Sequence, residues 1–231
     1  MAEEHKIAVI ARIHSDFSTK FGIPRQSGLV PQLQARIIFE PEFRIPEAVR
    51  GLEGFSHIWL IWQFSQAVRE KWSPTVRPPR LGGNERMGVF ATRSPYRPNS
   101  IGLSSVRLER VELDPDLGPV LHVSGADLMD GTPIYDIKPY APYADAHPEA
   151  RGGFTDQTPR RRLTVDCPPA LLELVPQEKR EALLGVLAED PRPAYQDDPD
   201  RVYAMTFAGL EIKFTVSQQK LTIGMVTPAE M

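Results

Sequence analysis

Residues 101–126, "IGLSSVRLERVELDPDLGPVLHVSGA", contain two strand-like runs separated by a turn signal. The two runs, Ile101–Leu113 and Val120–Ala126, are rich in branched aliphatic residues or alternate apolar with polar residues, as β-strands do. The residues between them, "DPDLGP" (Asp114–Pro119), favour a turn. The pattern predicts an antiparallel β-hairpin.

Further strand-like runs precede this hairpin. They lie at Ile7–Ile13, Gln34–Phe39, His57–Phe64 and Met87–Thr92. The apolar run Ile58–Trp62 predicts a central strand that is buried on both faces. Proline accounts for 23 of the 231 residues, which favours short elements and rigid turns. No segment of helical period separates the strands, so the first 145 residues indicate a β-barrel or sandwich.

The last third of the chain has a different pattern. Residues 141–162 have no periodicity and read as a surface loop or linker. In "VPQEKREALLGVLAED", Pro176 suits a first helical position. Four apolar residues then form one helical stripe: Ala182, Leu183, Val186 and Leu187. Three strand-like runs follow, at Val202–Phe207, Leu210–Val216 and Leu221–Val226. We therefore predict a mainly β chain, with one domain at residues 1–145 and a linker plus a small α+β domain at residues 146–231.

Composition argues against several classes of protein. The single cysteine excludes an internal disulfide and a cysteine-rich zinc site, and the five histidines are scattered, so we expect no metal. No apolar run approaches the roughly 20 residues that span a bilayer. The first residues, "MAEEHKIAVIARIH", do not resemble a signal peptide. The expected location is the cytoplasm, without a membrane partner.

Charge is distributed unevenly along the chain. The whole sequence carries −3, but nine basic and three acidic residues between Arg69 and Arg110 give that segment +6. A basic segment in an acidic protein can form an anion-binding face. A solvated loop with scattered arginines would have the same composition, so charge alone leaves both interpretations open.

Two polar stretches could form part of a ligand site. In "FGIPRQSGLVP" (Phe21–Pro31), Gly28 allows a positive φ or a close backbone approach to a ligand. An ordinary turn is the alternative. In "GFSHIWLIWQFSQ" (Gly54–Gln66), the apolar run ends in Ser65 and Gln66, polar groups at a strand end.

Two further stretches strengthen the case for a ligand. In "GVFATRSPYRPNSIGLS" (Gly88–Ser104), two prolines stiffen a bend that carries Arg93 and Arg97. Arginine pairs well with an anion or carboxylate. A pair of structural salt bridges is the alternative. "DLMDGTPIYDIKPYAPYAD" (Asp127–Asp145) combines a turn with carboxylates that could accept ribose hydroxyls or an amine. Its tyrosines could stack on a base. Gly-x-Gly-x-x-Gly and P-loop motifs for nucleotides are absent from the sequence.

The sequence resembles the TsaA/TrmO family. The resemblance rests on "FGIPRQSGLV", "VRGLEGFSHIWLIWQF", "TVRPPRLGGNERMGVFATRSPYRPNSIGLS", "DLMDGTPIYDIKPYAPYAD" and "DPRPAY". It implies a single-sheeted β-barrel and an S-adenosylmethionine-dependent methyltransferase. The implied target is N6 of threonylcarbamoyladenosine, next to the anticodon of a tRNA. The resemblance also implies a homodimer, with the cofactor near the subunit interface.

The resemblance also implies which residues bind. The cofactor contacts expected from it are Gln26, Ser27, Gly28, Ser65, Gln66, Arg93, Leu103, Leu128, Met129, Asp130 and Gly131. The residues that we expect to contact tRNA are Arg97, Lys138, Tyr143, Arg192 and Tyr195. For Arg192 and Tyr195, in "DPRPAY", a structural turn is the alternative. The motifs assign no catalytic residue.

Two other functions fit the same sequence. One is a non-catalytic sensor of S-adenosylmethionine or a nucleotide on the same barrel. The other is a dimer that binds RNA through the +6 segment. Binding of S-adenosylmethionine would argue against the RNA-binding dimer, and transfer of a labelled methyl group to tRNA would argue against the sensor.

Overall fold

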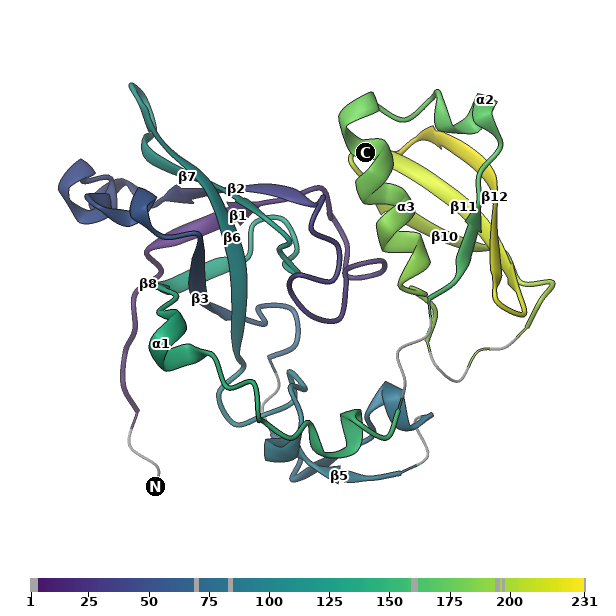
Figure 1. Ribbon diagram of the computed structural model, residues 1–231, viewed down its shortest axis with the longest axis horizontal. Coiled ribbons are helices and arrows are strands. Elements are labelled where there is room, and N and C mark those ends of the chain that lie inside the picture. Colours follow the sequence, from purple (N-terminus) through teal and green to yellow (C-terminus); the bar gives the residue numbers. More distant parts are fainter. Residues whose placement is uncertain are drawn as a thin grey trace.

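The first domain is a closed β-barrel in which each strand pairs with its two neighbours around the barrel (Figure 1). The structure is a computed structural model and describes residues 4–68, 71–82, 85–158, 162–193, 196 and 198–230. The barrel strands are β1 (Ala11–His14), β2 (Gln34–Phe39), β3 (His57–Gln63), β6 (Ile101–Asp114), β7 (Gly118–Ser124) and β8 (Pro133–Pro139). Their order is β1-β2-β7-β6-β3-β8, and every pair is antiparallel. The predicted single-sheeted barrel is confirmed.

The hairpin of β6 and β7 is present where the sequence predicts it. Its turn is closed by the Asp114 carboxylate, which accepts hydrogen bonds from the backbone N–H groups of Asp116 (2.9 Å) and Leu117 (2.8 Å). Gly118 follows with a φ of +70°, a conformation that a side chain disfavours. The turn residues therefore fix the register of β6 and β7.

Strand β3 differs from the prediction, because only one of its faces is buried. Ile58, Leu60 and Trp62 point into the barrel, whereas Trp59 and Ile61 are half-exposed on its outer surface. The expectation of a strand buried on both faces was wrong because a closed barrel covers only the inward face.

Three other strands differ from the prediction in their extent or in their presence. In the run Ile7–Ile13, strand pairing begins only at Ala11. In Met87–Thr92 only β5 (Met87–Gly88) pairs, with β4 (Thr75–Val76), and Val89–Ala91 forms the 3-10 helix η5. Strand β8 was not predicted, since prolines are rare within central strands. Here they stand at its two ends, Pro133 and Pro139.

Short helical segments precede and follow the barrel strands. Between β2 and β3 lie η1 (Pro41–Phe43), η2 (Pro46–Val49) and η3 (Leu52–Gly54), and between β4 and β5 lies η4 (Pro79–Leu81). After β8, the chain forms α1 (Pro142–Asp145) and η6 (Gly153–Thr155) before it enters the second domain. None of the helices in the described part of the chain has the length and apolar character needed to cross a membrane.

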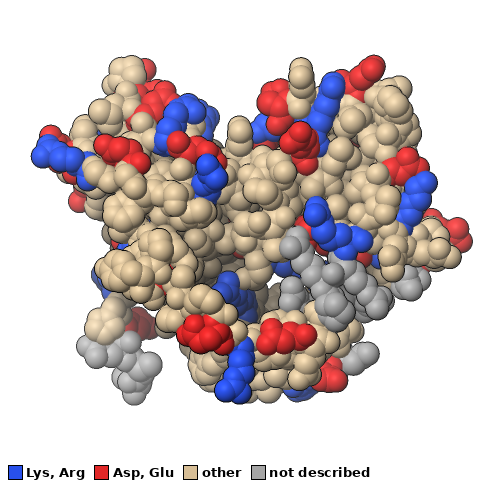
Figure 2. All heavy atoms as spheres, in the orientation of Figure 1, with Lys and Arg blue, Asp and Glu red and all other residues tan. Residues whose placement is uncertain are grey.

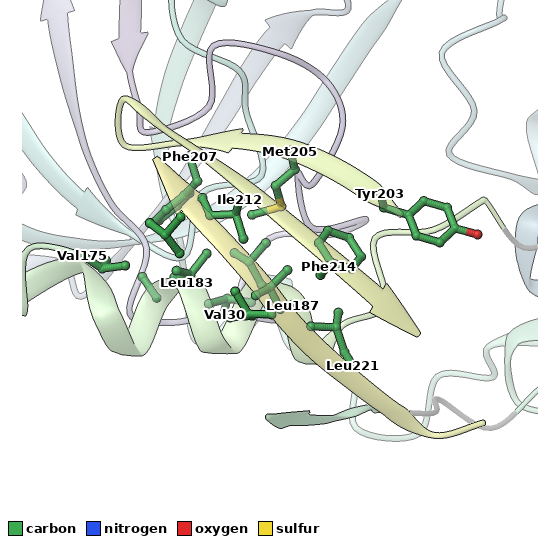
Figure 3. Close-up of a cluster of buried hydrophobic side chains, with 14 of the residues drawn as sticks. Val30, Val175, Leu183, Leu187, Tyr203, Met205, Phe207, Ile212, Phe214 and Leu221 are labelled. Atoms are coloured by element: carbon green, nitrogen blue, oxygen red, sulfur yellow. The ribbon is translucent and has the colours of Figure 1, made fainter. Parts of the chain in front are cut away.

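The second domain is a four-stranded sheet with a helix packed on one face (Figure 3). Its elements are β9 (Thr164–Asp166), α2 (Pro169–Leu172), η7 (Gln177–Lys179), α3 (Arg180–Ala188), β10 (Tyr203–Phe207), β11 (Leu210–Ser217) and β12 (Lys220–Pro228). The order is β10-β11-β12-β9, with β9 parallel to β12. All four residues of the predicted helical stripe are buried. The predicted small α+β unit is therefore confirmed.

The segment between β1 and β2, residues 15–33, which we call the connecting segment, belongs to the core of the second domain. Phe17 and Val30 are 1% exposed and join the cluster that contains Leu183 and Phe207. Figure 3 shows Val30 among the side chains of α3 and the sheet. The Phe17 and Phe207 rings meet edge to face, with centroids 5.4 Å apart.

Polar contacts hold the same segment. The Lys179 ammonium lies 2.7 Å from the Asp16 carboxylate, and both side chains are mostly buried. The backbone N–H of Ala208 donates to the carbonyl of Asp16 (2.9 Å). The connecting segment, which carries "FGIPRQSGLVP", is thus fixed by residues of the second domain.

Candidate functional site

A cleft of about 2300 Å³ lies between one end of the barrel, the second domain, and residues 64–100, which we call the loop layer. Figure 2 shows the surface hollowed above the loop layer, with Lys and Arg side chains at its edge. Pockets for one drug-sized ligand usually measure about 300–1,000 Å³. The cleft therefore has room for a cofactor and a second, larger substrate.

The cleft gathers residues from all four polar stretches of the sequence. Of the expected cofactor contacts, those that line it are Gln26, Ser65, Gln66, Arg93, Leu103 and Met129. These residues come from the connecting segment, the end of β3, the loop layer, the start of β6 and the segment after β7. Segments that are far apart in sequence thus meet at one place.

Two hydrogen bonds join residues that line the cleft. Nη1 of Arg93 donates a hydrogen bond of 2.5 Å to Oε1 of Gln26. Nζ of Lys20 donates to the carbonyl of Gln66 (2.6 Å). These contacts tie the connecting segment to the arginine-bearing bend and to the end of β3.

Gly28 holds the connecting segment against the barrel. Its N–H donates to the carbonyl of Gly125 (2.8 Å). Its φ is +76°, and a Cβ added to it would meet no atom within 4 Å. The glycine is therefore needed for its backbone conformation, and open space lies beside it.

The expected contacts after β7 are mostly engaged within the protein. The Leu128 side chain is buried in the barrel core, and its carbonyl accepts a hydrogen bond from the Ser15 hydroxyl (2.9 Å). The Asp130 carboxylate accepts the N–H of Ser15 (3.1 Å). The Gly131 carbonyl accepts Nη1 of Arg12 (3.1 Å). These three residues do not line the cleft, and neither do Ser27 and Gly28. Each of the five lies next in sequence to a residue that does line it.

The expected tRNA contacts are dispersed. Arg97 lines the cleft, but its Nη1 also donates to the Thr92 carbonyl (3.2 Å) and braces the bend. Arg192 lines it too, and its guanidinium is largely buried, with Nε and Nη2 both bound to the Asp190 carboxylate (2.9 and 3.0 Å). That pairing favours the structural alternative for "DPRPAY".

The remaining expected tRNA contacts do not line the cleft. Lys138 lies 2.9 Å from Asp136 on the barrel exterior, and the Tyr143 side chain on α1 is 93% exposed. Tyr195 lies outside the described residues.

Three residues that are not among the expected contacts form a chain of hydrogen bonds at the cleft. Nε1 of Trp62 donates to Oγ of Ser104 (3.0 Å), and Oγ of Ser104 donates to Oδ1 of Asp127 (2.6 Å). Burial raises the pKa of the Asp127 carboxyl, while the Ser104 hydrogen bond and the Arg93 charge oppose that rise. The sequence feature that could have predicted this chain is Ser104, a polar residue between Gly102 and Val106 on the inward side of β6.

An exposed aromatic pair also escaped the sequence prediction. The Trp72 and Phe90 rings stack with centroids 6.0 Å apart and an interplanar angle of 30°. Phe90 is 71% exposed and lines the cleft. Arg77 and Arg86 also line the cleft, and Lys71 precedes Trp72 in the sequence. The aromatic residues within this basic segment of the sequence could have predicted the pair.

Comparison with models of protein families shows to which family the chain belongs. The model of the tRNA-methyltransferase O N-terminal domain matches residues 12–146, and that of the TrmO C-terminal domain matches residues 162–229. The chain belongs to the tRNA-methyltransferase O (TrmO) family.

Individual TrmO relatives match over almost the whole chain. A protein of Escherichia coli K12 named tRNA (adenine(37)-N6)-methyltransferase is 40% identical over 227 residues, covering 95% of this chain and 96% of the relative. A Pseudomonas aeruginosa protein named as a candidate S-adenosylmethionine-dependent methyltransferase is 43% identical over 223 residues, with 90% and 91% covered. The crystal structure of TrmO from Pseudomonas aeruginosa superimposes with a TM-score of 0.80 at 35% identity and covers 99% of both chains.

Proposed function

We propose that this protein is an S-adenosylmethionine-dependent tRNA methyltransferase that modifies N6 of threonylcarbamoyladenosine next to the anticodon. The observation that carries the proposal is the convergence of four distant sequence stretches on one cleft. The family match over both domains and the names of the relatives support the same reaction.

The chemistry of the cleft residues fits S-adenosylmethionine. Arg93 offers a positive charge to the carboxylate of the cofactor, and Gln26 holds that arginine. Leu103 is 52% exposed beside it and provides an apolar surface for the adenosine part. When bound, the cofactor supplies a methyl group activated by a positively charged sulfur.

Eight further residues are proposed as cofactor contacts. They are Ser27, Gly28, Ser65, Gln66, Leu128, Met129, Asp130 and Gly131. The space beside Gly28 supports a close approach of the cofactor to the backbone. For Leu128 a backbone contact is the proposed mode, since its side chain is buried.

The proposed tRNA contacts are Arg97, Lys138, Tyr143, Arg192 and Tyr195, to which we add Trp72 and Phe90. An exposed aromatic pair at the rim of a cleft can stack on a nucleobase, and nearby basic residues can pair with phosphates. The size of the cleft also argues for the enzyme over a cofactor sensor, which would need no room for a second substrate.

The assembly and location are part of the proposal. We propose a symmetric homodimer in the cytoplasm, since two-fold dimers are the commonest soluble homo-oligomers. We retain the division into domains at residues 1–145 and 146–231. Light scattering tests the dimer, because an active species with the monomer mass of 25.9 kDa would contradict it.

Mass spectrometry of tRNA nucleosides tests the reaction. Threonylcarbamoyladenosine in tRNA treated with the protein and S-adenosylmethionine should gain one methyl group, and Arg93→Ala should reduce the yield. Calorimetry that shows cofactor binding while the tRNA stays unmodified would instead support the sensor.

A further inference from the structure

The proposed reaction poses a problem of proton transfer. The lone pair of N6 is delocalised into both the purine and the carbamoyl group, so the neutral nitrogen is a weak nucleophile. The nitrogen also carries a proton that must leave when the methyl group is attached. A group in the cleft that accepts this proton would make the attack easier.

The described lining of the cleft offers few groups that can accept a proton. It contains three carboxylates, Asp127, Glu189 and Asp190, and no histidine. Asp190 has both oxygens bound to the Arg192 guanidinium. Glu189 is only 9% exposed and is paired with Arg162 at 3.1 Å. Asp127 is the carboxylate that remains available to a substrate.

The position of Asp127 is fixed by a directional chain of hydrogen bonds. The Trp62 indole can only donate, so the Ser104 hydroxyl accepts from it and must direct its own proton to Oδ1 of Asp127. Trp62 and Ser104 are nearly fully buried, which keeps water away from both bonds. No side chain in the described part of the structure hydrogen-bonds Oδ2, the second carboxylate oxygen.

Close packing holds the beginning of this chain in place. Trp62 on β3 is paired with Gly102 on β6, and a Cβ added to Gly102 would collide with the indole ring. The glycine thus creates the space in which the indole reaches Ser104, two residues further along β6. The barrel register itself places the three groups in line.

The surroundings of Asp127 make its carboxylate more basic than that of an exposed aspartate. Burial raises the pKa of Asp127. Four groups oppose the rise: the Ser104 hydroxyl, the backbone N–H of Asp127 itself, the Arg93 guanidinium and the backbone N–H of Ser27. Arg93 is the one charged side chain among them. A general base works best when its pKa approaches the working pH.

We propose that Asp127 is the catalytic base, with Ser104 and Trp62 as positioning residues; the inference rests on the proposed function. The new bond joins N6 to the methyl carbon, and the methyl–sulfur bond breaks with its electron pair left on sulfur. The N6 proton moves to Oδ2 of Asp127, and the electrons of the N–H bond stay on nitrogen.

Asp127→Asn is the central test, because the amide oxygen can still accept the Ser104 hydrogen bond. We expect kcat to fall about 10²- to 10⁴-fold, the usual contribution of a general base. The Kd for S-adenosylmethionine, measured by calorimetry on the tRNA-free protein, should change less than about three-fold. Asp116→Asn, in the exposed β6–β7 turn, is the matched control and should leave kcat unchanged.

The pH profile distinguishes a base from a structural residue. The wild-type kcat should fall as the pH drops through the pKa of Asp127, and Asp127→Asn should lack this acid limb. Ser104→Ala removes a hydrogen bond that stabilises the ionised form, so it should shift the acid limb to higher pH. Carbon-13 NMR of the aspartate carboxyl groups, with Asp127→Asn for assignment, measures the same titration without any turnover.

Several results would overturn the inference. Asp127→Asn that retains more than about a tenth of the wild-type kcat would exclude a catalytic base. A loss of cofactor affinity that parallels the loss of activity would make Asp127 a cofactor ligand instead. If the wild-type protein leaves tRNA unmodified, the proposed function fails and this inference fails with it.

Discussion

The two hydrophobic cores of this molecule are assembled in different ways. The barrel core is formed by the inward residues of its own strands, with a few residues from the segments that join them. The core of the second domain is completed by Phe17, Val30 and Leu33, which come from the connecting segment near the beginning of the chain. The second domain is therefore also the support on which Gln26 and Gly28 are held beside the barrel.

The largest expected effect comes from removing this shared contact. Phe17→Ala should lower the free energy of unfolding by about 3–5 kcal/mol, because it deletes a fully buried aromatic side chain. It should also weaken cofactor binding, since the connecting segment loses its anchor. Urea denaturation and calorimetry measure the two effects.

Leu60→Ala in the barrel core provides the comparison. It should cost about 2–5 kcal/mol of stability, with a smaller effect on cofactor affinity in the folded protein. Equal losses of cofactor affinity in the two variants would show that the second domain gives the connecting segment no special support.

Arg93 hydrogen-bonds Gln26 of the connecting segment and tests the proposed cofactor contact in the cleft. Arg93→Ala should weaken S-adenosylmethionine binding by about 1.5–3 kcal/mol, the range for a hydrogen bond to a charged group. Arg50→Ala, an exposed arginine away from the cleft, is the control for loss of charge. Unchanged cofactor affinity in a folded Arg93→Ala protein would contradict the proposed contact.

The aromatic pair on the loop layer tests the contact with RNA. Trp72→Ala should weaken tRNA binding by about 1–3 kcal/mol if a base stacks on the pair. Cofactor affinity and melting temperature should stay the same, because the ring is half-exposed. Phe55→Ala, another exposed aromatic residue that does not line the cleft, should leave tRNA affinity unaltered. A fall in dimer stability instead of RNA affinity would assign the pair to a protein interface.

The smallest effect concerns stability and pH. Burial raises the pKa of Asp127 in the folded state, so the ionised form destabilises the fold. Wild-type stability should therefore decline as the pH rises from about 4, the pKa of an unfolded aspartate, through the folded value. Asp127→Asn should melt at a higher temperature than wild type at neutral pH, and the difference should vanish below about pH 4. A variant that melts lower at pH 7 would contradict this sign.

Local patterns explain what could be predicted from the sequence. The β6–β7 hairpin and helix α3 follow from regular periods and a turn, all within short windows. Phe17 was not recognised as a core residue, because polar neighbours surround it in "HSDFSTK". The Trp62–Ser104–Asp127 chain depends on the pairing of β3 with β6, which is fixed only when the barrel closes. Long-range register cannot be read from any single segment.

The shared core also sets the order in which the protein can mature on the ribosome. Phe17 packs against Phe207, so about 190 residues must be synthesised after Phe17 before its partner exists. At about 5–20 residues per second, this delay amounts to roughly 10–40 seconds. The barrel strands are complete long before then, whereas the connecting segment waits for the last strands to emerge. A nascent chain should thus acquire its cofactor affinity only at the end of translation.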